Sequence, residues 1–341
     1  MLRLEEATVR FAGRAALDRV GLEVAEREIV CVLGPSGGGK STLLRTVAGL
    51  QPLDTGRVFL EGRDLDGTPA HRRGVGLMFQ DHQLFPQRDV GGNVAFGLRM
   101  HGAPRGEQEA RVAELLDLVG LPGAARRAVA SLSGGEQQRV ALARALAPRL
   151  LMLDEPLGQL DRSLRERLVV ELRELFGRLG TTVLAVTHDQ GEAFALADRV
   201  VVMRDGRIAQ SGSPLEVWQR PADEFVARFL GFDNVVAATV TGRAADTPWG
   251  KLPVPESSPQ GPGTLLVRPA GVRLVDAPDG LRCTVAARTF RGTHVAVRLR
   301  PERAPELEAA CPLRIAPEPG DEVGVVFDAA EVVVLGGPCF D

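Results

Sequence analysis

The sequence predicts an α/β fold built on a mostly parallel sheet, followed by a smaller all-β domain. Apolar runs at 29–33, 150–154 and 182–187 have the length and composition of buried strands, and segments with helical spacing lie between them. A glycine-rich loop at 34–42 follows the first of these runs and opens a helix. From about 232–236 onward, short alternating segments replace the helical pattern, which is typical of a small β domain.

Length and composition narrow the class of protein. The 341 residues, 44% hydrophobic and 25% charged, are typical of a soluble globular protein with room for two domains. The net charge of -3 gives no reason to expect a nucleic-acid partner. No apolar run approaches the ~18 residues that a membrane span needs, and the N-terminal segment has acids where a signal peptide needs an apolar core. The four cysteines lack metal-type spacing, which favours a reducing cytoplasm.

The individual elements follow from the period of the apolar residues. Alternating or apolar segments predict strands over 2–11, 16–24, 29–33, 57–60, 74–80, 150–154 and 182–187 and a hairpin at 200–203 and 207–210. Helical spacing predicts helices over 40–50, 107–119, 133–146 and 163–179, and two short helices that end near Leu230. A stretch rich in Pro, Gly, Ser and Thr at 241–263 precedes predicted strands at 264–268, 282–288, 294–300, 323–327 and 331–335.

The glycine-rich loop has the context that phosphate binding requires. It follows the strand 29–33 and begins a helix that Gly49 and Pro52 close. Glycines let successive backbone N–H groups face one centre, and the helix N-terminus adds partial positive charge there. The loop therefore predicts binding of a nucleoside triphosphate. Its residues are Gly34, Pro35, Ser36, Gly37, Gly38, Gly39, Lys40, Ser41 and Thr42.

Two side chains of this loop are expected to contact the ligand. Lys40 is placed to reach the β- and γ-phosphates, and the Ser41 hydroxyl is placed to ligate Mg²⁺. Among the 41 lysines and arginines, only Lys40 and Lys251 are lysines. A chain that otherwise uses arginine has a compact ammonium here, where it suits phosphate better than a planar fork. The alternative interpretation, a glycine-rich turn with a chance lysine, leaves that choice unexplained.

Three predicted strands end in polar functional groups, namely Gln80, the pair Asp154 and Glu155, and His188. Ligands of open parallel sheets bind beyond the carboxyl ends of the strands, so we expect these groups at the same edge as the loop. Asp154 is placed to hold Mg²⁺, Glu155 to polarise an attacking water, His188 to contact the γ-phosphate, and Gln80 to sense both Mg²⁺ and water. Taken singly, a strand-end Asp–Glu pair is often a helix cap or a solvated turn, and a lone Gln or His at a strand end is more often structural.

A second anion site is predicted at the start of the helix that ends near Leu146. A serine followed by two glycines at a helix N-terminus favours an anion. The alternative is a plain capping box between Ser133 and Glu136, which can hold as structure and still leave the anion site open. The segment comprises Leu132, Ser133, Gly134, Gly135, Glu136 and Gln137.

These motifs, together with Leu160 and Asp161, have the order and spacing of the ATP-binding-cassette ATPases, which residues 1–232 resemble. The resemblance implies an α/β P-loop NTPase core with a helical subdomain at about 90–148. The C-terminal part, 233–341, resembles the small β, OB-like regulatory (TOBE) domains of bacterial importer ATPases. The stretches 79–86 and 266–274 point to that importer branch, with Ala270 where relatives have an acid.

The resemblance implies roles for the site residues. Two copies would dimerise head to tail, and each ATP would lie between Lys40 of one copy and Ser133 of the other. Glu155 would be the general base and His188 a switch that contacts the γ-phosphate. Phe11 corresponds to the aromatic residue that stacks on adenine, in a chain with no tyrosine. Taken alone, Phe11 could equally be a half-buried residue at a strand end.

The same resemblance implies the partners and the cellular location of the chain. Membrane permease subunits would dock just after Gln80, an extracytoplasmic solute-binding protein would supply the cargo, and the chain would lie at the cytoplasmic face of the membrane. No nucleic acid is expected. The solute stays open among iron(III), polyamines, thiamine, quaternary amines, sulfate and sugars, because the other subunits choose it.

Two departures and two competing functions complete the prediction. The connection at 147–149 is about two residues shorter than in relatives, and Gln159 is bulkier than the small residue usual at the dimer seam.

A soluble cassette ATPase acting on DNA or ribosomes would use the same site, but the chain has one cassette, no long coiled-coil insertion and no basic patch. A non-hydrolysing regulatory protein conflicts with the intact Lys40, Glu155 and His188.

Overall fold

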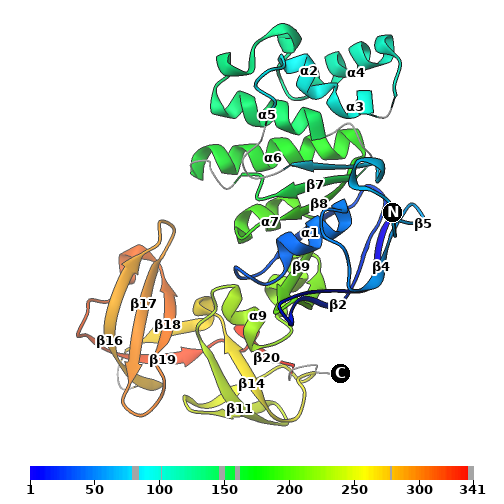
Figure 1. Ribbon diagram of the computed structural model, residues 1–341. Coiled ribbons are helices and arrows are strands. Elements are labelled where there is room, and N and C mark those ends of the chain that lie inside the picture. Colours follow the sequence, from blue (N-terminus) through cyan, green and yellow to red (C-terminus); the bar gives the residue numbers. More distant parts are fainter. Residues whose placement is uncertain (79–83, 101, 146–149, 158–161, 277–278, 337–341) are drawn as a thin grey trace. The chain divides into compact units, whose positions relative to one another are not determined.

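The structure is a computed structural model that describes residues 1–78, 84–100, 102–145, 150–157, 162–276 and 279–336. Its contacts divide the chain into two compact units, Met1–Leu215 and Glu216–Asp341. The first unit is α/β and the second is dominated by strands, which is the predicted fold class (Figure 1).

The division between the two units falls earlier in the chain than the predicted boundary at 232–236. The helices α8 (Pro214–Gln219) and α9 (Glu224–Phe229) therefore fall largely in the second unit. One reason is that Arg268 of the β-rich part donates hydrogen bonds to the backbone carbonyls of Trp218 and Gln219. The extent of each independently folding domain stays a prediction.

A six-stranded sheet organises the first unit. Its order is β10-β9-β3-β8-β7-β6, parallel throughout except for the β9–β10 hairpin. Every residue of β3 and β8 is buried, as expected for strands covered on both faces. The carboxyl ends of β3, β7 and β8 consequently lie side by side at one edge. The strands are β3 (Ile29–Leu33), β6 (Val75–Met78), β7 (Leu150–Asp154), β8 (Thr182–Val186), β9 (Arg199–Arg204) and β10 (Arg207–Gly212).

An antiparallel sheet, ordered β2-β1-β4-β5, packs onto the same core. Its strands are β1 (Leu2–Phe11), β2 (Arg14–Val24), β4 (Thr55–Leu60) and β5 (Arg63–Asp64). Alternation along β1 and β2 buries one face, so that Leu4 and Leu22 share a cluster with Leu43 of the first helix and Met152 of the large sheet. This shared core fixes the position of the first helix between the two sheets.

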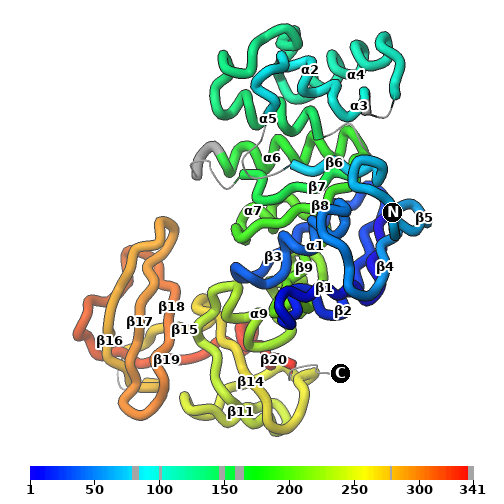
Figure 2. Tube along the Cα trace, viewed as in Figure 1, coloured from blue at the N-terminus to red at the C-terminus, as the bar shows by residue number. Residues whose placement is uncertain are grey.

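The helices of the first unit fall into two groups (Figure 1, Figure 2). Helices α1 (Lys40–Ala48), α6 (Arg162–Leu179) and α7 (Gln190–Leu196) belong to the sheet core. A helical layer beyond α6 contains α2 (Val90–Val94), α3 (Phe96–Met100), α4 (Arg105–Leu118) and α5 (Gly134–Ala145). Short 3-10 turns are η1 (Ala70–Arg72), η2 (Ala124–Arg126) and η3 (Val129–Ser131). The layer occupies the part of the sequence predicted as the helical subdomain.

Two five-stranded sheets, β13-β12-β11-β14-β20 and β15-β19-β16-β17-β18, form the second unit. The strands of the first are β11 (Val235–Thr241), β12 (Ala244–Thr247), β13 (Gly250–Pro253), β14 (Gly261–Val267) and β20 (Val332–Leu335). Those of the second are β15 (Val272–Val275), β16 (Leu281–Phe290), β17 (Val295–Pro301), β18 (Leu307–Cys311) and β19 (Glu322–Phe327). The 3-10 turns here are η4 (Pro269–Gly271), η5 (Leu313–Ile315) and η6 (Ala329–Glu331).

Several of these strands were absent from the sequence prediction, which assigned no structure to most of 241–263. Strands β12 and β13 have four residues each, too few for alternation to be recognised. Tertiary contacts hold them, because the nearby Trp249 is 4% exposed and its indole N–H donates to the Pro305 carbonyl at 2.8 Å. Within the described residues, no helix is both long and apolar enough to cross a bilayer.

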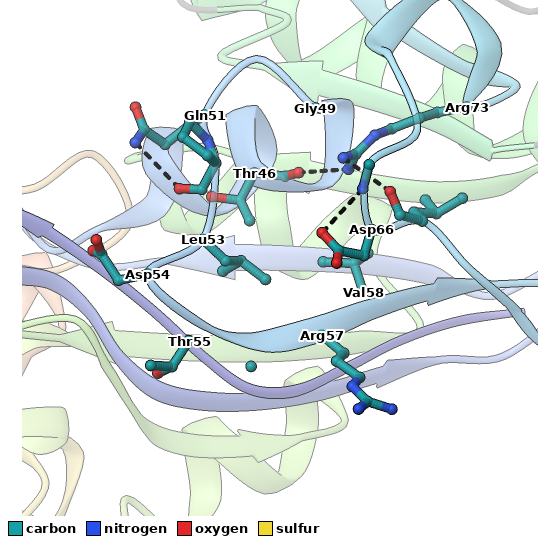
Figure 3. A pocket seen from close by; sticks show the side chains of 14 residues that line it. Thr46, Gly49, Gln51, Leu53, Asp54, Thr55, Arg57, Val58, Asp66 and Arg73 are labelled. Atoms are coloured by element: carbon teal, nitrogen blue, oxygen red, sulfur yellow. Dashed lines mark hydrogen bonds between the residues drawn. The ribbon is translucent and has the colours of Figure 1, made fainter.

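Arg73 fixes the C-terminal end of α1, a contact that the sequence did not predict (Figure 3). Its guanidinium donates to the carbonyls of Thr46 and Val47 at 3.0 and 3.1 Å, and also to those of Leu65 and Thr68. These carbonyls lie in the last turn of α1, where backbone donors are few: the Gly49 N–H donates to the Thr46 carbonyl at 3.1 Å, and Arg73 adds a second donor there. The side chain fits because position 49 is glycine, where a Cβ would lie 2.4 Å from the Arg73 Nε.

Replacing Arg73 with methionine is expected to destabilise the first unit by about 3 kcal/mol, because several carbonyls lose a charged donor. Urea unfolding followed by far-ultraviolet circular dichroism measures the loss. Both tryptophans lie in the second unit, so their fluorescence should report an unchanged transition. Arg72→Met, on the same turn but exposed, is the control. Equal transitions for the two variants would contradict this role of Arg73.

Candidate functional site

The loop between β3 and α1 is curled around Lys40. The Lys40 Nζ donates hydrogen bonds to the carbonyls of Gly34 at 2.7 Å and Pro35 at 3.0 Å. The side chain is 7% exposed, and burial lowers the pKa of its ammonium, while the carboxylates of Glu155 and Asp154 oppose that shift. The ammonium is therefore held within the loop, and the two acids after β7 act on it electrostatically.

At two positions of this loop, nearby backbone carbonyls leave no room for a side chain, so glycine is required. Gly34 and Gly39 have φ of 154° and 99°, and a Cβ at these positions would lie 2.4 Å from the Met203 carbonyl oxygen and 2.3 Å from that of Ala16. Gly39 is also the residue from which α1 begins. The structure thus gives a physical reason for the predicted curl, and the tip of the loop is exposed.

Asp154 ends β7, and the Ser41 side chain at the start of α1 is close enough to lower the pKa of its carboxyl. Burial raises the pKa of Asp154, and the neighbouring charge of Glu155 raises it further. A hydroxyl and a carboxylate are oxygen ligands of the kind that Mg²⁺ prefers. A divalent cation bound here would relieve the same charge crowding, so these residues fit the predicted metal.

Glu155 has a strained backbone. Its φ is 50°, a left-handed conformation that is uncommon for a residue with a side chain, and its N–H donates to the Val186 carbonyl at 2.9 Å. This hydrogen bond ties the end of β7 to the end of β8. The turn brings a carboxylate oxygen of Glu155 to 3.1 Å from Nδ1 of His188. The two residues that the sequence assigned to one edge are thus in direct contact.

The hydroxyl of Thr187 and the carboxylate of Glu192 lie behind His188, and the sequence prediction missed both. The Thr187 Oγ1 donates to Glu192 Oε2 at 2.8 Å and accepts from the N–H of Asp189 at 3.1 Å. Glu192 is 4% exposed, and burial raises its pKa to about 7, against the opposing hydrogen bond from Thr187. A lone glutamate on a short helix resembles a surface residue, so no sequence signal distinguishes it.

The 132–137 segment opens α5 with a capping box, which confirms the structural alternative. The Ser133 N–H donates to Glu136 Oε2 at 2.8 Å, and the Glu136 N–H donates to Ser133 Oγ at 3.3 Å. Arg127 also donates to Glu136, and this hydrogen bond is the main reason that the pKa of Glu136 is lowered to about 2. Ser133 and Gly134 remain exposed at the start of the helix.

Gln138 connects α5 to the site and was also missed. Its Nε2 donates to the Pro156 carbonyl at 2.5 Å, and the side chain is 6% exposed. The contact joins the helical layer to the turn that follows Glu155. Within the described part of the chain, no hydrogen bond joins the 132–137 segment to the loop of Lys40.

The remaining predicted residues divide into exposed and undescribed positions. Phe11 ends β1 at the hairpin, and the residue is 50% exposed to solvent. Gln80, Leu160 and Asp161 lie outside the described residues, as do the short connection 146–149 and Gln159.

Comparisons with known proteins follow the same division of the chain. A family model described as ABC transporter matches residues 17–158, and one described as TOBE domain matches residues 265–335. The chain is 84% identical over 340 residues to the Fe(3+) ions import ATP-binding protein FbpC of Streptomyces avermitilis, and the match covers 99% of each chain. It is 44% identical over 342 residues to the sulfate/thiosulfate import ATP-binding protein CysA 2 of Chromobacterium violaceum, covering 96% of this chain and 93% of that protein.

A solved structure matches part of the chain. The ATP-binding cassette MJ0796, as a dimer in a post-hydrolysis state with ADP and Pi, superposes with a TM-score of 0.55 at 32% identity, covering 63% of this chain and 99% of that one. None of these relatives is named for work on DNA or ribosomes. Near-complete coverage at 84% identity, with a matching cassette model, shows that the chain belongs to the ABC transporter family, as an ATP-binding and ATP-hydrolysing subunit of the importer type.

Proposed function

We propose that this chain drives the import of iron(III), as a homodimer at the cytoplasmic face of the membrane. The observation that supports the hydrolytic part best is the arrangement at the carboxyl edge of the sheet. Lys40 is held in the glycine loop, the Ser41 side chain lowers the pKa of Asp154, and a carboxylate oxygen of Glu155 lies 3.1 Å from His188 Nδ1. An ammonium, two oxygen-bearing side chains and a carboxylate–imidazole pair are therefore found at the carboxyl edge of one sheet.

Each side chain has a separate task in the proposed reaction. Lys40 and the loop N–H groups would bind the phosphates, and Ser41 and Asp154, with Gln80, would hold Mg²⁺. The bound Mg²⁺ would supply charge neutralisation on the phosphate oxygens. Glu155 would accept the proton of the attacking water, because its carboxylate stands at the strand end next to the phosphate site. His188 would contact the γ-phosphate and hold Glu155 in place.

A second copy is proposed to complete each site. Apart from the chain neighbours and the backbone of α5 itself, no described atom lies within 4 Å of a Cβ built at Gly134 or Gly135, so tertiary packing among the described residues does not require glycine there. Glycine at a helical position costs about 0.5–1 kcal/mol relative to alanine, which favours a requirement from outside the chain. The exposed Ser133 and the N-terminus of α5 would contact the ATP of the opposite copy. Phe11, half exposed, would stack on the adenine.

The cargo and the other partners rest on the relatives. The relative named for iron(III) ions is 84% identical across its whole length, whereas the one named for sulfate and thiosulfate is 44% identical. The higher identity favours iron(III). Permease subunits would dock on the region after Gln80, and a solute-binding protein outside the membrane would deliver the ion.

Glu155→Gln is expected to bind ATP normally and to lose turnover by at least about 100-fold, because an amide cannot accept the proton of water. Equilibrium binding of a fluorescent ATP analogue and phosphate release measure the two properties. Glu171→Gln, a surface carboxylate on α6, is the control and should retain both. Unchanged turnover in Glu155→Gln would exclude Glu155 as the base.

Mixed dimers test whether two copies share each site. Lys40→Met and Ser133→Arg variants, each also with Glu155→Gln to prevent hydrolysis, should retain no ATP alone. Their mixture should retain up to about one ATP per dimer, because one composite site is intact. Size-exclusion chromatography with nucleotide quantification measures retention. The control mixture combines Lys40→Met with the double variant Lys40→Met, Ser133→Arg, so that no site has an intact Lys40. Equal ATP retention in the two mixtures would contradict the shared site.

Stimulation by cargo tests the proposed solute. The chain, reconstituted in proteoliposomes with its co-purified permease subunits, should hydrolyse ATP several-fold faster with a binding protein loaded with iron(III) than with the same protein lacking it. Phosphate release measures the rate, with Glu155→Gln as the background control. Stimulation by a sulfate-loaded binding protein instead would replace iron(III) with sulfate as the cargo.

A further inference from the structure

The hydroxyl of Thr187 connects the two residues that flank His188. Thr187, immediately before His188, receives a fixed position from its own N–H, which donates to the Val32 carbonyl of β3 at 3.2 Å. Its Oγ1 accepts the N–H of Asp189, immediately after His188, at 3.1 Å. The hydroxyl thus links the residue before His188 to the residue after it. Its rotamer therefore affects the backbone conformation of the turn at His188.

Glu192 is the acceptor that sets this rotamer. Its Oε2 lies 2.8 Å from the Thr187 Oγ1, so the hydroxyl hydrogen points to the carboxylate and leaves a lone pair for the Asp189 N–H. Thr187 and Glu192 are 2% and 4% exposed, so water has no ready access to replace the contact. Removing the carboxylate would free the hydroxyl to rotate away from the turn.

The carboxylate of Glu192 has no evident task in holding its own helix. Asp189 already caps α7, because its Oδ1 accepts the Glu192 N–H at 3.0 Å, and its Oδ2 accepts from Arg165 of α6 at 2.8 Å. The second oxygen of Glu192, Oε1, is buried without a partner among the described residues. Burying a carboxylate in this way is costly, and an apolar side chain would fill the space more cheaply.

We propose that Glu192 is a positioning residue for His188, which acts through the Thr187 hydroxyl to hold the imidazole against Glu155 and toward the γ-phosphate. The inference rests on the proposed function, in which His188 contacts the phosphate. Misplacement of a reacting group by about 1 Å can cost about 100-fold in rate. The effect should therefore appear in turnover rather than in ATP binding.

Steady-state ATP hydrolysis by the full chain tests whether Glu192 is needed as the acceptor of the Thr187 hydroxyl. Glu192→Ala should lower kcat about ten- to hundredfold and leave the KM for ATP within about twofold, because only orientation is lost. Glu192→Gln, whose amide oxygen still accepts from Thr187, should stay within about threefold of the parent. Thr187→Val should resemble Glu192→Ala, and Thr187→Ser should restore most of kcat. A parent-like kcat in Glu192→Ala, or equal losses in the Ala and Gln variants, would overturn the proposal.

Asp198→Asn controls for a loosened α7. Asp198 follows the other end of that helix, where it accepts from the Ile29 N–H at 3.0 Å and from Arg173 at 2.9 Å. This variant weakens the attachment of α7 without touching the turn of His188. Its kcat should stay within about twofold of the parent. A loss as large as that of Glu192→Ala would show that any weakening of α7 suffices, which would refute a specific role of Glu192.

A readout without turnover separates this inference from the proposed function. In ¹⁵N-histidine-labelled protein, the imidazole resonance that disappears in His188→Ala is that of His188. It should shift in Glu192→Ala and remain in place in Asp198→Asn. An unmoved resonance would overturn the positioning role even if His188→Ala abolishes hydrolysis. Full hydrolysis by His188→Ala would instead refute the proposed role of His188, and the inference with it.

Discussion

Burial of β3, β7 and β8 on both faces is the constraint on which the rest of the first unit depends. A strand covered on both sides has no room for polar side chains, and β3 and β8 contain none that is exposed. Functional groups can therefore appear only where these strands end. Since the strands are parallel neighbours, their ends meet at one edge, and the glycine loop, Asp154 and His188 converge there.

The glycines at the two helix starts differ in what requires them. At Gly34 and Gly39 the chain's own carbonyl oxygens would clash with a Cβ, so the fold accounts for both residues. At Gly134 and Gly135 no described atom is close, although glycine weakens the first turn of α5. The fold alone therefore accounts for the glycines of the first loop, whereas packing within the described chain does not require those at the exposed start of α5. That contrast favours a site divided between two copies.

The sequence predicted those parts of the site whose signals are local. Lys40 and Ser41 lie in a glycine loop of recognisable spacing, and Glu155 and His188 directly follow apolar runs. Contacts between distant segments were invisible. Arg73 caps a helix that ends 25 residues earlier in the chain, and Gln138 reaches Pro156 across the helical layer. Strands of four residues, such as β12, lack enough positions for a period, and pairing with β11 and β13 and packing around Trp249 decide their structure.

Two departures from local rules involve residues near His188. Glu155 adopts a left-handed backbone that costs on the order of 1 kcal/mol or more, and Glu192 buries a carboxylate with one unpartnered oxygen. Neither serves the stability of the fold, because an unstrained turn and an apolar side chain would both be more favourable. Both instead fix the surroundings of one imidazole, Glu155 by direct contact and Glu192 through Thr187. Departures of this kind are expected at functional sites, and these two meet at the imidazole between the ends of β7 and β8.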